Sequence, residues 1–129
     1  MTLQEYFENT NGRAVLATAD ASGKVDIAVY SKPHFIDDET IAFIMADRLT
    51  HANLKSNPSA AYLFMEAGEH YAGKRLFLTK TKEDQDKEVI ATMRRRKCYV
   101  VTEGYEQEQQ FLVYFKIDKV LPLIGFGGK

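Results

Sequence analysis

The chain has 129 residues, of which 45% are hydrophobic, so it can bury one core but not two. Its formal net charge of −1 argues against general binding to nucleic acids or to membrane surfaces, because both normally need a basic excess. Because no apolar run has the length of a membrane span and the first residues lack a secretory pattern, we expect one cytoplasmic domain over residues 1–129.

The first third of the chain predicts a short helix and three strands. Thr2–Glu5 has the sequence of a capping box, which predicts a helix that ends before Asn11-Gly12. Two strands should follow, Arg13–Ala19 and Lys24–Ile36, and the turn-forming residues between them predict a hairpin. The apolar segment Thr40–Ala46 predicts a third strand.

The third strand leads into a short polar helix that Pro58 must end. Its first turn receives Asp47, Arg48 and Thr50. Free N–H groups, the positive end of the helix dipole, a guanidinium and a hydroxyl together form an anion site that suits a phosphate monoester. The alternative is an ordinary capped helix with Asp47 as the N-cap and Arg48 in solvent. Spacing alone favours this alternative.

The second half of the chain predicts further strands and one longer helix. Ala60–Met65 and Leu76–Thr79 are expected to be strands, and a helix is expected to open at Thr81, with acidic residues in its first turn. A short strand at Tyr99–Val101 would precede the last strand, Phe111–Val120, whose weak alternation indicates burial on both faces.

Several sequence features do not point to a site. The basic run Arg94–Lys97 lies at a helix end, where the dipole favours cations, so we interpret it as a solvated face. Cys98 has no partner cysteine and is interpreted as a packing residue. His34, His51 and His70 lack the spacing of metal ligands, and no glycine-rich loop stands between a strand and a helix. We therefore expect no metal site.

Six short strands and few helices indicate a mainly β protein with an antiparallel barrel. Large apolar residues along Tyr62–Phe64 and Phe111–Phe115 exceed what one face of one sheet can cover. The sequence therefore predicts a second copy of the chain as the partner that buries some of them.

Three segments, in the same order and spread over nearly the whole chain, resemble the pyridoxamine 5'-phosphate oxidase-like FMN-binding split barrels. Ala46–Pro58 is similar to the segment before the N-P-x-x-A strand of that family. Asp26–His34 resembles a strand that runs beside the flavin and often ends in Ser-Arg-Pro, with Lys32 in place of the arginine. Leu123–Gly128 is similar to the G-F-G tail of some members, including relatives that handle haem. Many members have a lysine in place of Thr50, which would shift phosphate contacts onto Arg48 and Lys32.

The resemblance implies a six-stranded antiparallel Greek-key split β-barrel that forms a homodimer, with FMN in a groove between the two subunits. Arg48, Thr50 and Lys32 would contact the phosphate, and the segment from Val29 to Ser31 would line the flavin ring through backbone groups. The full set of residues expected to bind FMN is Val29, Tyr30, Ser31, Lys32, Ala46, Asp47, Arg48, Thr50 and Phe126.

A bound flavin would itself supply hydride or electron transfer, so no catalytic side chain is predicted. The expected function is a flavin-dependent oxidoreductase for a small molecule, and the alternative is a pure electron carrier. Oxidation of pyridoxamine phosphate is not expected, because the C-terminal arginine motif of those enzymes is not found. A third reading is a haem-binding module with His51 or His70 as axial ligand. It ranks below FMN, because both histidines lie in polar segments.

Overall fold

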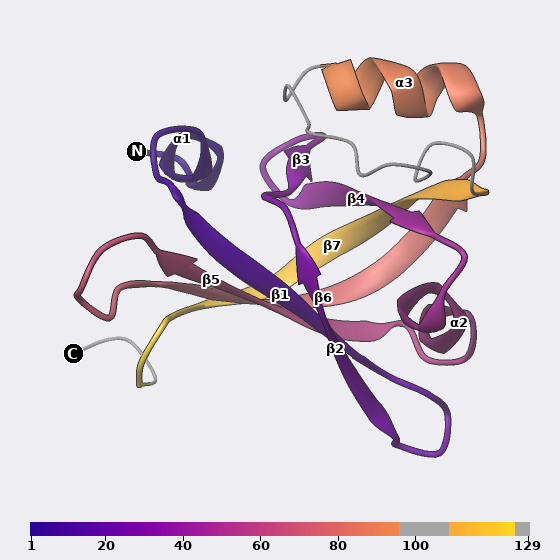
Figure 1. Ribbon diagram of the computed structural model, residues 1–129, viewed down its shortest axis with the longest axis horizontal. Helices are drawn as coiled ribbons and strands as arrows, with labels where there is room; N and C mark the ends of the chain where they lie inside the picture. Colours follow the sequence, from indigo (N-terminus) through magenta and orange to yellow (C-terminus); the bar gives the residue numbers. More distant parts are fainter. Residues whose placement is uncertain (96–108, 126–129) are drawn as a thin grey trace.

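One strongly curled antiparallel sheet dominates the computed structural model, which describes residues 1–95 and 109–125 (Figure 1). In chain order the elements are α1 (Leu3–Glu8), β1 (Gly12–Ala19), β2 (Val25–Tyr30), β3 (His34–Phe35), β4 (Thr40–Ala46), α2 (Leu49–Ser56), β5 (Ser59–Glu66), β6 (Gly73–Asp84), α3 (Lys87–Arg95) and β7 (Gln110–Pro122). Their order in the sheet is β2-β1-β5-β6-β7-β4-β3. The mainly β class is therefore confirmed.

The connections between strands form a Greek key. β5, β6 and β7 make a meander, and β4 lies beside β7 on its far side. In the described residues the sheet has seven strands where six were predicted, because the strand predicted over 24–36 is divided into β2 and β3 at Pro33, which has no N–H to donate. The short strand predicted at Tyr99–Val101 lies outside the described residues. β2 and β3 are also the edges of the sheet, and at most about 14 Å of chain separates Tyr30 from His34. The sheet must therefore curl into an open barrel.

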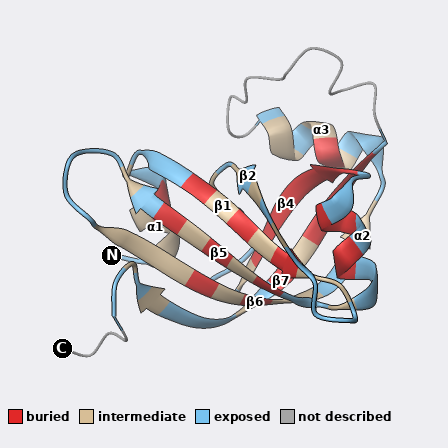
Figure 2. Ribbon diagram, turned by 60° about the horizontal axis from the view of Figure 1, so that its bottom comes forward, coloured by how far each residue is buried: buried red, intermediate tan, exposed pale blue. Residues whose placement is uncertain are grey.

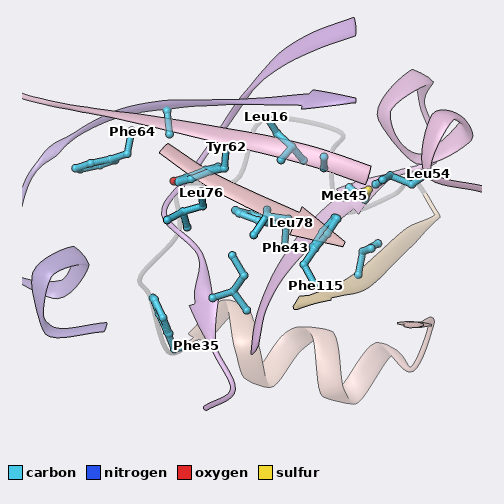
Figure 3. Close-up of a cluster of buried hydrophobic side chains, with 14 of the residues drawn as sticks. Leu16, Phe35, Phe43, Met45, Leu54, Tyr62, Phe64, Leu76, Leu78 and Phe115 are labelled. Atoms are coloured by element: carbon cyan, nitrogen blue, oxygen red, sulfur yellow. The ribbon is translucent and has the colours of Figure 1, made fainter. Parts of the chain in front are cut away.

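The interior of this barrel is filled by large apolar side chains. Tyr62 and Phe64 of β5 are completely buried, and the ring centroids of Tyr62 and Phe43 are 5.1 Å apart. Figure 3 shows side chains of β1, β3, β4, β5, β6, β7 and α2 converging on this space. The core therefore joins both halves of the chain, and it fixes the position of α2 through Leu54.

Helix α3 covers the outer face of the sheet at β4 and β7, which explains why β4 is buried along most of its length (Figures 1 and 2). Ile90 of α3 packs with Ala42, Ile44 and Leu112 in a second apolar cluster. The predicted start of this helix at Thr81 is wrong. β6 continues to Asp84 because it keeps pairing with β7, and the helix begins only at Lys87.

Most of the apolar residues that were expected to need a second subunit are covered within the chain, and only Leu63 and Tyr114 are half-buried. Phe111 is 6% exposed and Phe115 is fully buried, as are Tyr62 and Phe64. The burial on both faces predicted for Phe111–Val120 is found only as far as Phe115, and from Lys116 on most residues of the strand are exposed. Large exposed apolar side chains lie instead on the outer face of β2, on Val25, Ile27 and Val29. In the described residues, this row on β2 is therefore one exposed apolar surface that a second copy could cover.

Candidate functional site

The N-terminus of α2 follows directly on the buried end of β4. Arg48, not Asp47, is the N-cap residue, and its side chain makes no capping hydrogen bond. The first bond of the helix runs from Ala52 N–H to the Arg48 carbonyl oxygen, at 2.9 Å. The N–H groups of the first turn thus receive no acceptor from the cap. This geometry does not match the ordinary capped helix with Asp47 as N-cap, and it leaves the positive end of the helix open to an anion.

Polar side chains on the inner face of α2 attach it to the β1–β2 hairpin. Thr50 is 5% exposed, and its hydroxyl donates to a carboxylate oxygen of Asp26 on β2, at 3.4 Å. Asn53 is also buried, and its side-chain amide donates to the Thr18 hydroxyl at 3.1 Å. Because the Thr50 hydroxyl faces Asp26, a phosphate contact from Thr50 would come from its backbone N–H. The start of α2 therefore lies beside the start of β2.

Strand β2 is an edge of the sheet, so alternate residues direct their N–H and C=O groups away from β1. Val29 is 82% exposed on the outer face, whereas the Tyr30 ring packs edge-on against Phe43, with centroids 5.7 Å apart. The ring of Tyr30 is thus engaged in the core, and the predicted contact of its backbone with a flavin ring stays a prediction. Four residues of extended chain, about 13 Å, separate Tyr30 from Asp26.

The remaining predicted residues are distributed unevenly around α2. Ala46 is buried as the last residue of β4, and Asp47 and Arg48 are exposed after it. Lys32 lies elsewhere: its ammonium donates to the carbonyl oxygens of Phe7 and Thr10 at the end of α1, at 2.8 and 3.1 Å. The phosphate role of Lys32 stays a prediction, and it would require the ammonium to leave these carbonyls. Phe126 and Cys98 lie outside the described residues.

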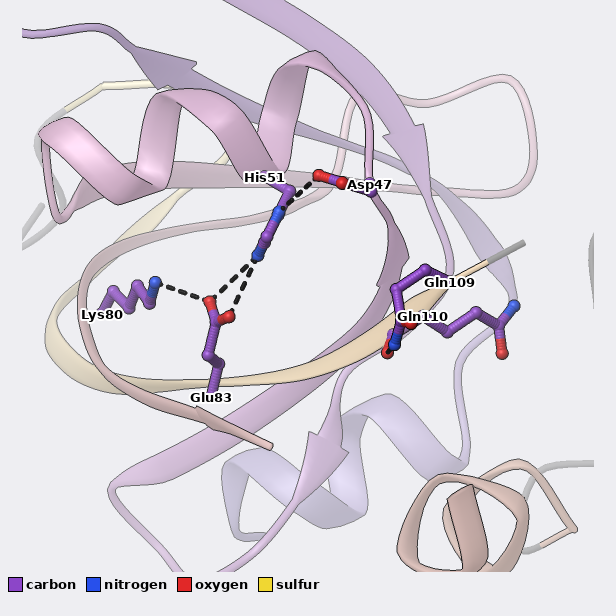
Figure 4. Close-up of polar contacts among 6 residues, drawn as sticks. All are labelled: Asp47, His51, Lys80, Glu83, Gln109 and Gln110. Atoms are coloured by element: carbon purple, nitrogen blue, oxygen red, sulfur yellow. Dashed lines mark hydrogen bonds and ion pairs between the residues drawn. The ribbon is translucent and has the colours of Figure 1, made fainter. Parts of the chain in front are cut away.

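A buried histidine between two carboxylates lies directly behind this N-terminus (Figure 4). His51 has no exposed surface, and its ring nitrogens lie 3.0 Å from carboxylate oxygens of Asp47 and Glu83. Burial opposes ionisation of Glu83, but hydrogen bonds from Lys80 and His51 outweigh it and hold the pKa of Glu83 below its usual range. The spacing of Asp47 and His51, one helical turn apart, could have indicated the first contact. The second contact joins residues 32 positions apart.

His70 belongs to a separate polar cluster that fixes α1 against β5. The Tyr6 hydroxyl donates to Glu66 at 2.6 Å, and His70 approaches the same carboxylate at 3.4 Å. Burial, with the bond to Glu66, raises the pKa of Tyr6, and that bond lowers the pKa of Glu66. The His70 side chain is 63% exposed. In the described ranges, no group of three acidic, histidine or cysteine side chains has an arrangement that could hold a metal ion.

None of the helices in the described part of the chain has the length and apolarity that a membrane span requires.

Comparison with known proteins identifies the fold. No family model and no curated protein matches the chain. Among solved structures, it is similar to an FMN-binding protein from Syntrophomonas wolfei subsp. wolfei, with 24% identity, a TM-score of 0.76, and coverage of 94% of this chain and 83% of the other.

Two further solved structures cover 94% of this chain. One is a candidate pyridoxamine 5'-phosphate oxidase from Lactobacillus delbrueckii, with 18% identity, a TM-score of 0.66 and 93% of its own chain covered. The other is the haem storage protein HutZ from Vibrio cholerae, with 22% identity, a TM-score of 0.61 and 94% of its own chain covered. Similarity at these identities establishes the architecture. The chain therefore has the pyridoxamine 5'-phosphate oxidase-like split-barrel fold.

Proposed function

We propose that the chain binds FMN, with the phosphate at the N-terminus of α2 and the flavin ring along the outer edge of β2. The observation that carries this proposal is the uncapped N-terminus of α2, attached to the edge strand by the contact between Thr50 and Asp26. First-turn N–H groups and the helix dipole favour a phosphate, and the exposed Arg48 can add a guanidinium.

The site as we propose it depends on backbone groups and a single exposed cation. Thr50, His51 and Asn53 direct their side chains to internal partners. Among the side chains proposed for the phosphate, we expect the exposed Arg48 to contribute most of the binding energy, because its guanidinium carries a permanent positive charge at the N-cap of α2. A flavin held in this way would itself supply the hydride or electron transfer, while the protein contributes orientation and electrostatics.

Within this proposal we favour a flavin-dependent oxidoreductase that acts on a small molecule over a pure electron carrier. The two are separated by turnover: an oxidoreductase should accept electrons from NADH or NADPH and pass them to an acceptor repeatedly. A carrier should exchange electrons with a reduced partner protein but fail with both nucleotides.

The proposed functional unit is a homodimer. Val25, Ile27 and Val29 are 82%, 65% and 82% exposed, and they lie side by side on the outer face of an edge strand. Soluble monomers rarely leave such an apolar row in water, so a second copy is the partner that fits it best. The row lies on the same strand that we propose for the flavin ring, which would link the dimer to the cofactor.

Haem is a second candidate, because HutZ, which has a similar fold, is described as a haem storage protein. The two histidines predicted as axial ligands argue against it. Both ring nitrogens of His51 face carboxylates, and His70 is largely exposed beside Glu66. An axial ligand needs a free ring nitrogen directed into an apolar pocket. Titration with haemin should therefore give no sharp Soret band that depends on His51.

The deciding experiment is titration of the purified chain with FMN, followed by flavin fluorescence and absorbance. We expect one FMN per chain, and riboflavin, which lacks the phosphate, should bind much more weakly. Arg48→Ala should weaken FMN binding by about ten- to a hundredfold, corresponding to about 1.5–3 kcal/mol for a charge-assisted contact. Lys55→Ala, which removes an exposed cation at the other end of the same helix, is the matched control and should bind like the wild type. A wild type that ignores FMN refutes the proposal.

A further inference from the structure

His51 is a buried ionisable side chain that the proposed flavin site does not itself use. Its ring has no exposed surface and stacks on Phe111, with centroids 3.8 Å apart and planes inclined by 14°. Nδ1 lies 3.0 Å from Asp47 Oδ1, and Nε2 lies 3.0 and 3.2 Å from the two carboxylate oxygens of Glu83. Figure 4 shows the ring between the two acids, with Lys80 on the far side of Glu83.

The count of donors and acceptors determines the protonation state of this ring. A neutral imidazole has one N–H and one bare nitrogen, and an ionised carboxylate can only accept. Glu83 is kept ionised by Lys80, whose ammonium donates to it at 2.8 Å, and the Asp47 side chain is 56% exposed to water. The imidazolium, with two N–H groups, is therefore the state that satisfies both contacts. A neutral ring would direct a lone pair at one of the carboxylates in a buried place, which is costly.

The charged groups around the ring come from two directions. Asp47 belongs to the connection from β4 to α2, and Glu83 and Lys80 belong to β6, while β7 contributes the uncharged ring of Phe111. A doubly protonated His51 thus bridges Asp47, the residue before the α2 N-cap, and Glu83 of β6. Removing one partner from such a buried ionic group is more damaging than replacing the group as a whole. The direction of the first turn of α2 should therefore depend on the charge of His51.

We propose that His51 is a positioning residue, held as an imidazolium between Asp47 and Glu83, that orients the N-terminus of α2 and links FMN retention to its protonation. This inference rests on the proposed FMN site for its ligand. Because the proton stabilises the arrangement that receives the phosphate, FMN should bind more weakly when His51 becomes neutral. The charge of His51 would act on the flavin through the phosphate contact, so the affinity for a flavin without a phosphate should not depend on that charge.

The charge of the ring is tested without any flavin. A long-range ¹H–¹⁵N spectrum of the histidine rings at neutral pH should show both nitrogens of His51 protonated, with the signal assigned by its loss in His51→Gln. A spectrum with one bare nitrogen on His51 overturns the inference. Asp47→Asn replaces the exposed charged acceptor with a neutral one, so the spectrum of this variant at neutral pH should no longer require an N–H on the His51 ring nitrogen that faces residue 47. This variant also serves if His51→Gln does not fold.

The link to FMN is tested by dissociation constants over a pH series that stays above the second ionisation of the phosphate near 6. Wild-type affinity should fall about tenfold once the ring is neutral, within the usual size of coupling between two sites, whereas riboflavin affinity should not change. His51→Gln should bind FMN weakly at every pH, with a flat profile. His70→Gln, which changes the exposed histidine beside Glu66, is the matched control and should keep the wild-type profile.

The two possible failures can be distinguished. A wild type that binds no FMN at any pH refutes the proposed function, and with it the link to the flavin. A wild type that binds FMN with the same affinity from neutral to alkaline pH, or a His51→Gln variant with the wild-type profile, refutes this inference alone.

Discussion

The proposed dimer surface on β2 can be tested by one substitution, Ile27→Lys. Ile27 is 65% exposed, and its neighbour on the paired strand is Ala17. Because the side chain faces outward, a lysine at this position can extend into water in the monomer. The stability of the monomer should change by no more than about 0.5 kcal/mol, which is usual for exposed positions.

The effect on the dimer should be much larger. Complete burial of an aliphatic side chain contributes about 1.5–3 kcal/mol, and Ile27 has roughly two thirds of its surface left to bury. Each copy would thus lose about 1–2 kcal/mol, and a two-fold interface contains two copies, so the loss is about 2–4 kcal/mol. This corresponds to a dissociation constant about 30- to 1000-fold higher.

Sedimentation over a dilution series measures the dissociation constant, and thermal unfolding of the diluted protein measures the monomer. Tyr71→Lys is the control, because Tyr71 is 76% exposed but lies in the turn between β5 and β6. It should leave the dimer intact. An Ile27→Lys protein that dimerises as tightly as the wild type refutes the proposal that β2 forms the dimer interface. A wild-type monomer that binds FMN with full affinity refutes the shared site.

Three further predictions concern stability. A Cβ at Gly12 would lie 2.3 Å from the Met65 carbonyl oxygen, so Gly12→Ala should lower the free energy of unfolding by about 2–3 kcal/mol. Gly23 lies in open space at a φ of +92°, so Gly23→Ala should lower it by only about 1 kcal/mol. Urea unfolding of the two variants compares these values. Lys32→Ala should lower the free energy of unfolding by about 1.5–3 kcal/mol through the loss of its two carbonyl contacts, and FMN titration of the same variant tests the predicted phosphate contact, which a large loss of affinity would support and an unchanged affinity would refute. Because folding lowers the pKa of Glu83, the ionised carboxylate stabilises the folded state fully above about pH 5, and this stabilisation disappears as the pH falls through the lowered pKa. The free energies of unfolding of the wild type and of Glu83→Gln should therefore converge in acid.

Local sequence signals predicted the elements whose formation depends on neighbouring residues. The Thr2 hydroxyl accepts from Glu5 N–H, and the Glu5 carboxylate accepts from Thr2 N–H, so the capping box is confirmed. The predicted strand Thr40–Ala46 has the bounds of β4, because a turn precedes it and a helix follows it directly. The hairpin of β1 and β2 also forms as predicted, with Asp20 accepting hydrogen bonds in the turn.

Features that depend on distant residues could not be predicted. Glu83 and Asp84 have the pattern of acidic residues in a first helical turn, yet pairing with β7 holds both in a strand. This tertiary contact outweighs local propensity, as it often does. Because Glu83 was predicted to lie in the helix that begins at Thr81, its contact with His51 of α2 was not predicted either. The apolar residues of β5 and β7 were assigned to a dimer surface because the cover that α3 and the curled sheet provide is not visible in sequence.

The buried face of α2 suggests how selective the proposed site can be. Its polar side chains attach the helix to the sheet, through Thr50 and Asn53 to the hairpin and through His51 to β6. The phosphate would then depend on backbone N–H groups and on Arg48, which provide charge and direction but few side-chain hydrogen bonds. Such a site should distinguish FMN from riboflavin by charge and bind inorganic phosphate only weakly. Displacement of bound FMN by millimolar inorganic phosphate measures this directly. A dissociation constant for phosphate as low as that for FMN would show that the flavin ring contributes nothing to the affinity.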